Sequence, residues 1–259
     1  MGVQNLFSVE GKTVVVTGGS RGIGAMIAEG FLRNGAKSVY ITARKVEECQ
    51  AAAARLSAFG KCEAFPADLT KPEGIELVAR EVEAREAQLD VLINNAGAVW
   101  AEPFDELGVA AWDKVMNINV KAVFFLTQRL HKMLIASASH ENPARVINIG
   151  SIDGLHCPPL ETYPYSASKA AVHHLTRTMA ARLAPDNILV NCLAPGPFES
   201  KMMAATLAAL GDQIKEASPV KRIGRPEDIA GAAIFLASKA SMFITGAVIP
   251  VDGGISTTL

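Results

Sequence analysis

A regular alternation between short apolar runs and helical patterns restricts the fold of this chain more than any other feature. The apolar runs are rich in β-branched residues and predict strands over 12–18, 38–44, 61–67, 89–97, 144–151, 187–195 and 247–251. Apolar positions at helical spacing predict helices over 22–34, 45–59, 72–87, 108–138, 163–184 and 226–238. This order predicts a single α/β domain spanning 1–259, with a doubly wound parallel sheet of about seven strands flanked by helices.

The composition suits such a domain and excludes several classes of protein. Hydrophobic residues make up 49% of the 259 residues and charged residues 20%, so the chain has enough apolar material for a core and is not disordered. Its 25 basic and 26 acidic residues nearly balance, which gives no indication of a nucleic-acid partner. No apolar run reaches the roughly 18 residues of a membrane span, so no membrane partner is expected either.

The first residues of the chain indicate where the protein is located, and the spacing of its cysteines indicates whether it binds a metal. The start of the chain lacks the basic and apolar stretches of a secretory signal. The four cysteines form no CxxC pair and stand at no zinc-ligand spacing from a pair of histidines. We expect a cytoplasmic protein without a metal site.

A glycine-rich turn follows the first predicted strand. In doubly wound sheets ligands bind beyond the carboxyl ends of the strands, so candidate residues are sought there. The first strand leads into Thr17-Gly-Gly-Ser-Arg-Gly-Ile-Gly24, where a helix begins. These glycines permit a sharp turn and let the backbone approach a pyrophosphate, which exposed N–H groups and the helix dipole attract. The position favours a dinucleotide cradle over an ordinary turn.

The end of the second strand indicates which dinucleotide binds. NAD-binding sites usually carry an acid there, whereas an arginine suits the 2′-phosphate of NADP. Here the strand ends Thr42-Ala43-Arg44 without an acid, and Arg21 lies in the glycine turn on the same side. Two guanidiniums can hold a phosphate in forked, charge-assisted bonds. The two arginines could simply be solvated at the surface. Their pairing and the missing acid instead favour a 2′-phosphate site, and therefore NADPH and NADP+ as cofactor.

A second group of residues suits carbonyl chemistry. Tyr165 and Lys169 are four apart in a helical pattern and share a face, Ser151 ends the fifth strand, and Asn119 lies on the helix after the fourth. Reducing a carbonyl needs a hydride from the cofactor and a proton for the new alkoxide. Ser151 would hold the carbonyl oxygen near the phenol. Lys169, as a neighbouring cation, is expected to lower the pKa of Tyr165 from about 10.

Several motifs in this order resemble those of the short-chain dehydrogenase/reductase family over nearly the whole chain. They are the segment 17–24, Asn94-Asn95-Ala96-Gly97, Pro195-Gly196 and Val251-Asp252-Gly253-Gly254, together with Asn119, Ser151, Tyr165 and Lys169. The resemblance implies that the last four form a catalytic tetrad in a Rossmann fold. It implies a cofactor site made of Gly18, Ser20, Arg21, Gly22, Ile23, Gly24, Arg44, Asp68, Leu69, Asn95, Ala96, Gly97, Tyr165, Lys169, Pro195, Gly196, Phe198 and Ser200.

Within the family, three stretches resemble the bacterial NADPH-dependent 3-oxoacyl reductases, especially those of the rhamnolipid pathway: 141–151, 194–202 and 245–254. Two departures are Ser200, where the family usually has Thr, and Phe198, where it usually has Ile or Val. Ser200 can still donate to the nicotinamide carboxamide, and Phe198 is expected to narrow or reshape that side of the site. The resemblance alone also implies a homotetramer, in which the helices over 108–138 and 163–184 pair across two-fold axes.

The substrate is expected to be a small carbonyl compound in contact with Ser151, Asp153, His156 and Tyr165. A mobile flap is expected around 197–217, helical over 199–216. Ser166 and Ser168 flank the catalytic pair and are expected to face elsewhere on the helix.

Together these expectations predict an NADPH-dependent ketoreductase that converts a ketone to a secondary alcohol. A 3-oxoacyl thioester is one candidate substrate. The alternative is an NAD-linked alcohol, sugar or polyol dehydrogenase of the same fold, against which Arg44 without an acid argues. A nucleotide sensor without turnover would not need Tyr165 together with Lys169. The same pair and Arg44 argue against a Rossmann methyltransferase.

Overall fold

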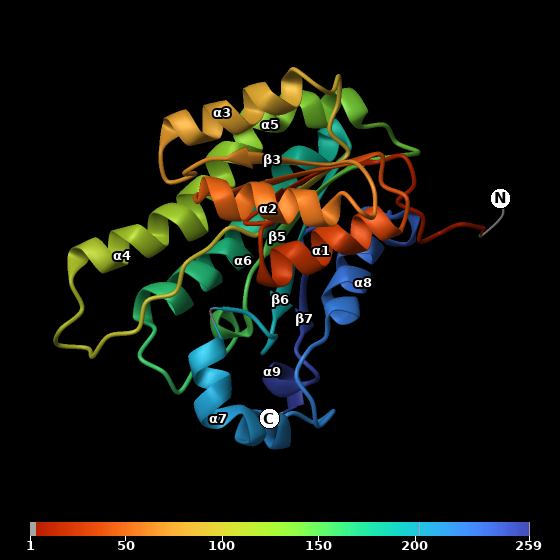
Figure 1. The fold of residues 1–259 in the computed structure, drawn as a ribbon. Helices are drawn as coiled ribbons and strands as arrows, with labels where there is room; N and C mark the ends of the chain where they lie inside the picture. The colour runs from red at the N-terminus through yellow and green to blue at the C-terminus, as the bar shows by residue number, and fades with distance from the viewer. Residues whose placement is uncertain (1–3, 202, 259) are drawn as a thin grey trace.

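A parallel sheet runs through the centre of the computed structural model, which describes residues 4–201 and 203–258 (Figure 1). Its strands in these residues are β1 (Thr13–Thr17), β2 (Ser38–Ala43), β3 (Cys62–Pro66), β4 (Val91–Asn94), β5 (Ala144–Ile149), β6 (Ile188–Pro195) and β7 (Val248–Val251). They lie in the order β3-β2-β1-β4-β5-β6-β7, and every neighbouring pair is parallel. The predicted single-domain, doubly wound fold is confirmed.

Helices connect the strands and cover both faces of the sheet. They are α1 (Gly22–Arg33), α2 (Val46–Leu56), α3 (Pro72–Glu83), α4 (Val109–Met116), α5 (Ala122–Ser137), α6 (Tyr163–Leu183), α7 (Ala204–Ala217), α8 (Pro226–Ala237) and α9 (Ile255–Thr258). Short helical turns are η1 (Asn117–Lys121), η2 (Ile152–Gly154), η3 (Ala184–Asp186) and η4 (Lys239–Ser241). Among the helices so described, none combines the length and the apolar character that crossing a bilayer would require.

The strands separate two apolar cores because successive side chains point to opposite faces. Val14 and Val16 of β1 enter the core beneath α1, α2 and α8. Val15, between them, enters the core beneath α3, α5 and α6. All five residues of β1 are buried, as expected for a central parallel strand covered on both faces (Figure 1). This burial fixes the register of the sheet and therefore the place of the loops at its carboxyl edge.

The helix predicted over 108–138 is interrupted. Between α4 and α5 the backbone forms the five-residue π-helical segment η1. A π segment takes one more residue per hydrogen-bonded turn while apolar residues keep nearly helical spacing, so the sequence pattern does not reveal it. The predicted single helix is wrong at this point, and Asn119 lies within the interruption.

Two other boundaries differ from the sequence pattern. The strand predicted over 89–97 ends at Asn94, because the backbone N–H groups of Asn95 and Ala96 leave the sheet and bind Thr17 Oγ1. The helix of the predicted flap begins at Ala204 and not at 199. Phe198 instead pairs with Gly224 in an isolated bridge, which holds the backbone extended there.

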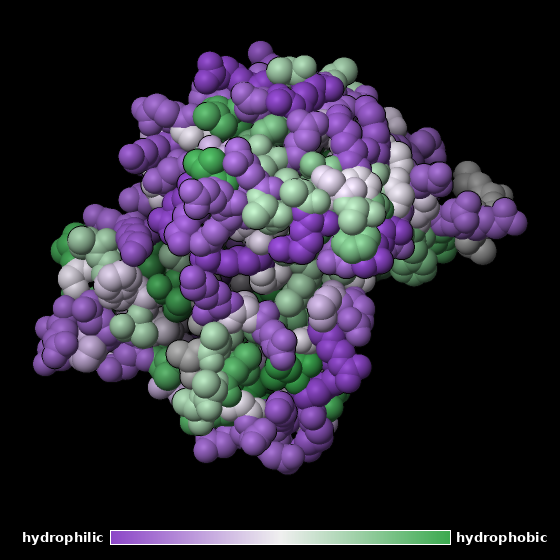
Figure 2. Space-filling view, viewed as in Figure 1, coloured by the Kyte–Doolittle hydropathy of each residue, from purple (hydrophilic) through white to green (hydrophobic). Residues whose placement is uncertain are grey.

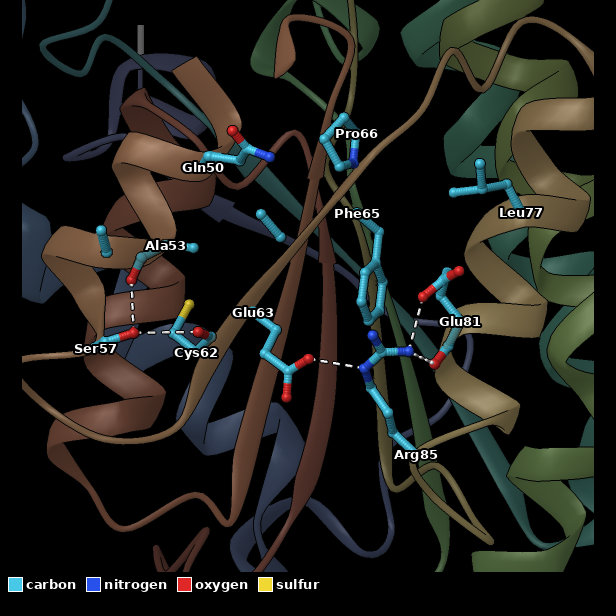
Figure 3. A pocket seen from close by; sticks show the side chains of 12 residues that line it. Gln50, Ala53, Ser57, Cys62, Glu63, Phe65, Pro66, Leu77, Glu81 and Arg85 are labelled. Atoms are coloured by element: carbon cyan, nitrogen blue, oxygen red, sulfur yellow. Dashed lines mark hydrogen bonds and ion pairs between the residues drawn. The ribbon is translucent and has the colours of Figure 1, made fainter. Parts of the chain in front are cut away.

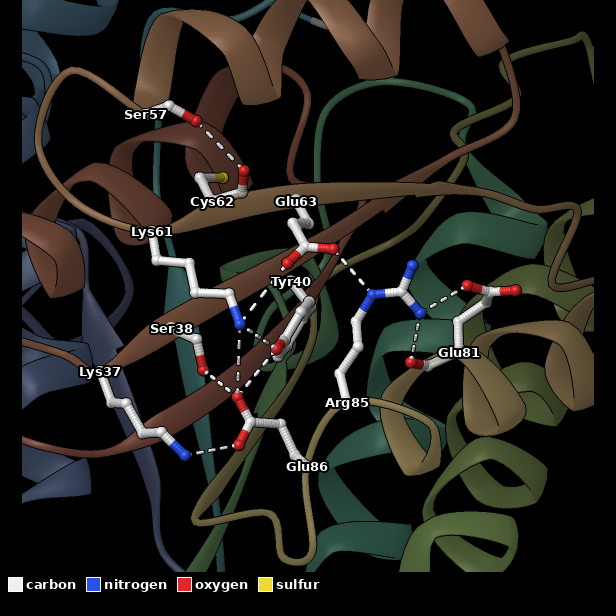
Figure 4. Close-up of polar contacts among 10 residues, drawn as sticks. All are labelled: Lys37, Ser38, Tyr40, Ser57, Lys61, Cys62, Glu63, Glu81, Arg85 and Glu86. Atoms are coloured by element: carbon white, nitrogen blue, oxygen red, sulfur yellow. Dashed lines mark hydrogen bonds and ion pairs between the residues drawn. The ribbon is translucent and has the colours of Figure 1, made fainter.

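At the opposite, amino end of the sheet, a buried carboxylate ties β2 to its neighbours (Figure 4). Glu86, 7% exposed, accepts hydrogen bonds from Lys37 Nζ at 2.7 Å, Ser38 Oγ at 2.8 Å and Tyr40 OH at 2.8 Å. Burial alone would raise the pKa of Glu86, but these donors outweigh it and the pKa is lowered. Because each partner is satisfied inside the cluster, this group of charges is structural.

Candidate active site

The glycine turn between β1 and α1 has the geometry of an anion cradle. Gly22 has φ of 53°, a left-handed conformation that side chains disfavour. A Cβ on Gly24 would lie 2.4 Å from the carbonyl oxygen of Gly18, so only glycine lets α1 start this close to the strand. The residue before α1, Arg21, provides no side-chain cap, and the first turn holds no acid. Its free N–H groups and the helix dipole therefore suit a phosphate.

The segment after β4 fixes this turn in place. Thr17 Oγ1 accepts hydrogen bonds from the backbone of Asn95 and Ala96, both at 2.9 Å. Asn95 Nδ2 in turn donates to Thr17 O at 2.8 Å. The carboxyl ends of β1 and β4 are thus bound together, and Gly97 beyond them is exposed at the surface. This segment, one of the sequence motifs behind the family resemblance, thus holds the glycine turn in place.

The two predicted phosphate-binding arginines both lie in solvent, and one already has a partner. Arg44 directly follows β2 and is exposed. Its charge acts on Asp68, whose pKa is lowered because hydrogen bonds from Thr70 together with nearby cations outweigh burial. Arg21 Nη1 lies 3.1 Å from Oε2 of Glu48. Sequence reasoning missed Glu48, although its place just after β2 could have drawn attention to it.

Other predicted cofactor residues differ in how far their side chains are exposed to the crevice. Leu69 is 4% exposed and belongs to the core beneath α3 and α5, so only its backbone can face a ligand. Phe198 is 2% exposed, and its ring packs on Gly224. The expectation that this ring narrows the nicotinamide side is therefore wrong, because the bridge to Gly224 draws it into the core. Ser200 instead lies over the glycine turn, 3.2 Å from where a Cβ on Gly22 would be.

The backbone of the turn after β6 is held by the last strand. Pro195 ends β6 and is buried, while Gly196 N donates to Val251 O at 3.1 Å. A Cβ on Gly196 would lie 2.7 Å from that of Asp252. At the glycine turn, Ser20 and Ile23 are both half-buried beside the phosphate cradle.

Ser151, Tyr165 and Lys169 meet at the carboxyl edge, as predicted. Ser151 follows β5, and its hydroxyl accepts the backbone N–H of Asp153 at 3.2 Å while it hydrogen-bonds Tyr165. Lys169, one turn along α6, places Nζ 5.4 Å from the centre of the Tyr165 ring. The same ammonium donates to Ile149 O at 2.8 Å, which anchors it to the end of β5. The arrangement can hold a carbonyl oxygen beside a phenol.

The pKa values at this site oppose the prediction made from the sequence. Burial raises the pKa of Tyr165 to about 12, although the Ser151 hydrogen bond lowers it. Burial also lowers the pKa of Lys169 to about 8. The expectation that Lys169 lowers the pKa of Tyr165 is wrong for the protein without cofactor, because desolvation of the phenol is the larger effect.

Asn119 reaches the site indirectly. It is 2% exposed in η1, its Oδ1 accepts Ala98 N at 2.9 Å, and its Nδ2 donates to Ala98 O at 3.0 Å. The same Nδ2 donates to Ser168 Oγ at 2.9 Å, and Ser168 donates to Tyr165 O at 2.7 Å. The prediction that Ser168 faces elsewhere is wrong, since this serine connects Asn119 to the backbone of Tyr165. The side chain of Asn119 thereby positions α6.

Two predicted substrate residues follow Ser151. Asp153 is half-buried, burial raises the pKa of its carboxyl, and no hydrogen bond or ion pair reaches that carboxyl from residues 4–201 or 203–258. Its charge acts on both Tyr165 and Lys169. His156 Nδ1 lies 3.1 Å from Cys157 O, while its Nε2 is buried without a partner in the described structure. Both groups therefore retain capacity to bind a ligand.

His173 is a site residue that sequence reasoning assigned to no role. It lies four residues after Lys169 on the same face of α6 and is 3% exposed. Its ring fills the space behind the active-site strand end, where a Cβ on Gly150 would lie 2.3 Å from Nε2. Burial, helped by the nearby charge of Lys169, lowers the pKa of His173 to about 4. The helical spacing from Lys169 was the available signal.

A groove of about 540 Å³ runs along β3 between α2 and α3 (Figure 3). The described residues that line it include none of the predicted site residues. Ser57 Oγ contacts the carbonyls of Ala53 at 2.8 Å and Cys62 at 3.1 Å, and Arg85 pairs with Glu63 and Glu81, both at 2.7 Å. The side chains of Ser57, Glu63, Glu81 and Arg85 are thus engaged with one another or with the backbone, and the described lining residues form no reactive constellation.

Comparison with known proteins agrees with this geometry. Residues 18–256 match the family model described as enoyl-(acyl carrier protein) reductase. The chain is 47% identical over 252 residues to the rhamnolipids biosynthesis 3-oxoacyl-[acyl-carrier-protein] reductase of Pseudomonas aeruginosa, covering 96% of this chain and 97% of that protein. It is 35% identical over 258 residues to gluconate 5-dehydrogenase of Gluconobacter oxydans, covering 98% of each.

A solved structure extends the likeness to three dimensions. The Pseudomonas aeruginosa RhlG/NADP active-site complex superposes with a TM-score of 0.93 at 45% sequence identity, covering 98% of this chain and 100% of that one. The matched region includes the glycine turn, Ser151, Tyr165 and Lys169. The chain belongs to the short-chain dehydrogenase/reductase family.

Proposed function

We propose that this protein is an NADPH-dependent ketoreductase that transfers a hydride to a ketone and yields a secondary alcohol. The observation that carries the proposal is the meeting of Ser151, Tyr165 and Lys169 at the carboxyl edge of the sheet, beside the glycine turn. The similar Pseudomonas aeruginosa proteins, a 3-oxoacyl reductase and an NADP complex, support the reaction and the cofactor.

The residues present fit the cofactor along the whole crevice. The uncapped start of α1 and the glycine turn would hold the pyrophosphate. Arg21 and Arg44 would receive the 2′-phosphate, with Asp68 and the segment 95–97 on the adenosine side. Pro195, Gly196 and Ser200 would line the nicotinamide, together with Tyr165 and Lys169. When bound, the reduced nicotinamide supplies the hydride.

The side chains of this protein supply the proton and the orientation. Ser151 holds the carbonyl oxygen beside the phenol of Tyr165, which donates its proton to the oxygen as the alkoxide forms. With a pKa of about 12, that phenol is fully protonated at neutral pH and ready to donate. Lys169, anchored on Ile149 O, keeps an ammonium near the ring as negative charge develops on Tyr165. The protonated phenol thus suits the proton-donating step of ketone reduction.

The proposed substrate class rests on a relative and on the residues at the mouth of the site. A 3-oxoacyl thioester is proposed because of the 47% identical relative. Asp153 and His156 would line the entry, and the unpaired carboxylate of Asp153 would disfavour anionic sugar acids such as a ketogluconate. Figure 2 shows apolar residues on the surface over α7 and α9. Residues 197–217 would form a mobile flap whose apolar face covers an acyl chain.

The test measures NADPH oxidation with 3-oxoacyl thioesters of increasing chain length and with 5-ketogluconate. We expect turnover of the thioesters, and little or none with the sugar acid. Faster turnover of 5-ketogluconate, or of a polyol with NAD+, would establish the alternative polyol dehydrogenase function supported by the 35% identical relative. Asp153→Asn should improve the sugar acid and leave the neutral thioester nearly unchanged.

A homotetramer in the cytoplasm is proposed as the working form. Large apolar side chains are exposed along α4 and α5, including Val109 at 77%, Phe125 at 42%, Trp112 at 39% and Phe124 at 38%. Helix faces of this kind suit isologous pairing across a two-fold axis. Light scattering should give four copies, and Phe125→Asp should reduce the assembly. A monomer at micromolar concentration would contradict the proposal.

A further inference from the structure

We propose that Glu48 is a specificity-determining residue that competes with the 2′-phosphate of the cofactor for Arg21. Its carboxylate would weaken the binding of 2′-phosphorylated nucleotides and leave nucleotides without that phosphate unaffected. The inference rests on the proposed NADP site, but it does not depend on which ketone is reduced.

The contacts of Glu48 carry the inference. Its Oε2 lies 3.1 Å from Arg21 Nη1, and its Oε1 lies 2.7 Å from Lys45 Nζ. Both carboxylate oxygens are thus engaged by cations, one from the glycine turn and one from the residue before α2. The charge of Lys201, at the start of the flap region, also acts on Glu48. Cations from three separate segments therefore converge on one carboxylate.

This convergence resembles the charge pattern that a phosphate dianion needs. Arg21 directly precedes the uncapped first turn of α1, and Arg44 adjoins Lys45 at the end of β2. A 2′-phosphate held by Arg21 and Arg44 would therefore come close to Glu48. Glu48 accepts from Nη1 of Arg21, so a phosphate has to compete with the carboxylate for that side of the guanidinium and is also repelled by its charge.

The exposure of the pair sets the size of the effect. The side chains of Arg21 and Glu48 are 54% and 40% exposed. Exposed ion pairs are weak and screened by water, so the cofactor can break this one at modest expense. Removing the competition should tighten the binding of a 2′-phosphorylated nucleotide by roughly threefold to tenfold.

Titration calorimetry with nucleotide fragments tests the inference without turnover. The probes are adenosine 2′,5′-bisphosphate and adenosine 5′-monophosphate, and the proteins are the wild type, Glu48→Gln and Glu47→Gln. Glu47 is the matched control, because it also lies in the first turn of α2 but is exposed and forms no ion pair within the described residues. We expect Glu48→Gln to bind the bisphosphate three to ten times more tightly, and Glu47→Gln to match the wild type for both probes.

A double variant decides whether Glu48 acts through Arg21. In an Arg21→Ala background, Glu48→Gln should no longer tighten the bisphosphate, because the contested guanidinium is gone. Equal tightening in both backgrounds, or weaker binding by Glu48→Gln alone, would overturn the inference. A wild type that binds both probes equally would instead contradict the NADP assignment, so the two failures are distinguishable.

Discussion

The two ends of the crevice differ in how far their charged side chains are exposed to water. We call the end at Tyr165 and Lys169 the catalytic end and the end at Arg21 and Arg44 the phosphate end. Lys169 is 6% exposed, and burial moves its pKa and that of Tyr165 in opposite directions. The side chain of Arg21 is 54% exposed and forms an ion pair with Glu48, which is also open to water. Buried charges are strongly tuned and expensive, whereas exposed charges are screened and replaceable. Substitutions at the first end should therefore have larger effects than those at the second.

The largest effect is expected for Tyr165→Phe, which removes only the proton donor. Turnover should fall by about 10²–10⁴-fold while NADPH binding stays nearly intact. Tyr163→Phe is the matched control, since Tyr163 is the exposed neighbour whose hydroxyl contacts Glu161 at 2.8 Å. Steady-state kinetics and cofactor titration of both variants provide the measurement. A Tyr165→Phe enzyme that retains more than about a tenth of wild-type kcat would contradict general acid catalysis by this residue.

Ala43→Asp should have the largest effect at the phosphate end. The new carboxylate would repel the 2′-phosphate and offer an acceptor to the ribose hydroxyls of NADH. We expect kcat/KM for NADPH to fall by about a hundredfold and that for NADH to stay level or rise. Equal losses with both cofactors would show that the end of β2 does not contact the ribose.

Lys169→Met should abolish most turnover but stabilise the fold at neutral pH. Burial lowers the pKa of Lys169 from its ordinary 10.5 to about 8, so the folded state holds this proton less tightly than the unfolded state. Below about pH 8 both states carry the proton, and the full penalty, roughly 3 kcal/mol, is present. The penalty fades as the pH rises towards 10.5.

Urea unfolding across this pH range measures the effect. Lys169→Met should gain about 2–3 kcal/mol at pH 7, somewhat less than the full penalty because its bond to Ile149 O is lost, and the gain should shrink near pH 10. The exposed Lys132→Met serves as control and should change stability by less than about 0.5 kcal/mol. A gain that does not depend on pH would show that packing, and not charge, is responsible.

The smallest effect is expected for Arg44→Ala, which removes an exposed phosphate contact. NADPH binding should weaken by about tenfold, at the low end for a charged hydrogen bond, because water screens Arg44. NADH binding should hardly change. Added salt should reduce the difference between wild type and variant, whereas the Tyr165→Phe defect should be insensitive to salt. If salt changed both the Arg44→Ala and the Tyr165→Phe defects, or neither, the proposed difference between exposed and buried charges would be wrong.

Local patterns in the sequence were sufficient for the fold and for much of the site. Apolar runs and helical spacing depend on neighbours in the chain, so the order of strands and helices was predictable. Ser151, Tyr165 and Lys169 could be brought together because the carboxyl ends of parallel strands meet at one edge. The glycine turn and the arginines followed from the same rule.

The remaining features depend on the assembled structure. The direction of the Tyr165 pKa follows from how completely the surrounding chain removes water, which no spacing reveals. Ser168 faces Asn119 because η1 brings that helix against α6. The pairing of Glu48 with Arg21 joins two segments 27 residues apart, and Phe198 turns inward through its bridge to Gly224.

The π-helical segment η1 makes the length of this region as important as its sequence. A π turn holds one residue more than an α turn, so one deleted residue between 117 and 121 would either convert η1 to a regular α turn or change the phase of the helix beyond it by about 100°. Either Asn119 would rotate away from Ala98, or the buried stripe of Leu126, Leu130 and Leu134 would rotate out of the core. A substitution in α5, by contrast, changes the contacts of one residue and leaves the phase of the helix unchanged. Loss of a single residue from η1 would break either the Asn119 contacts to Ala98 and Ser168 or the packing of α5 in one step, so we expect natural variants to conserve this spacing more strictly than the residues themselves.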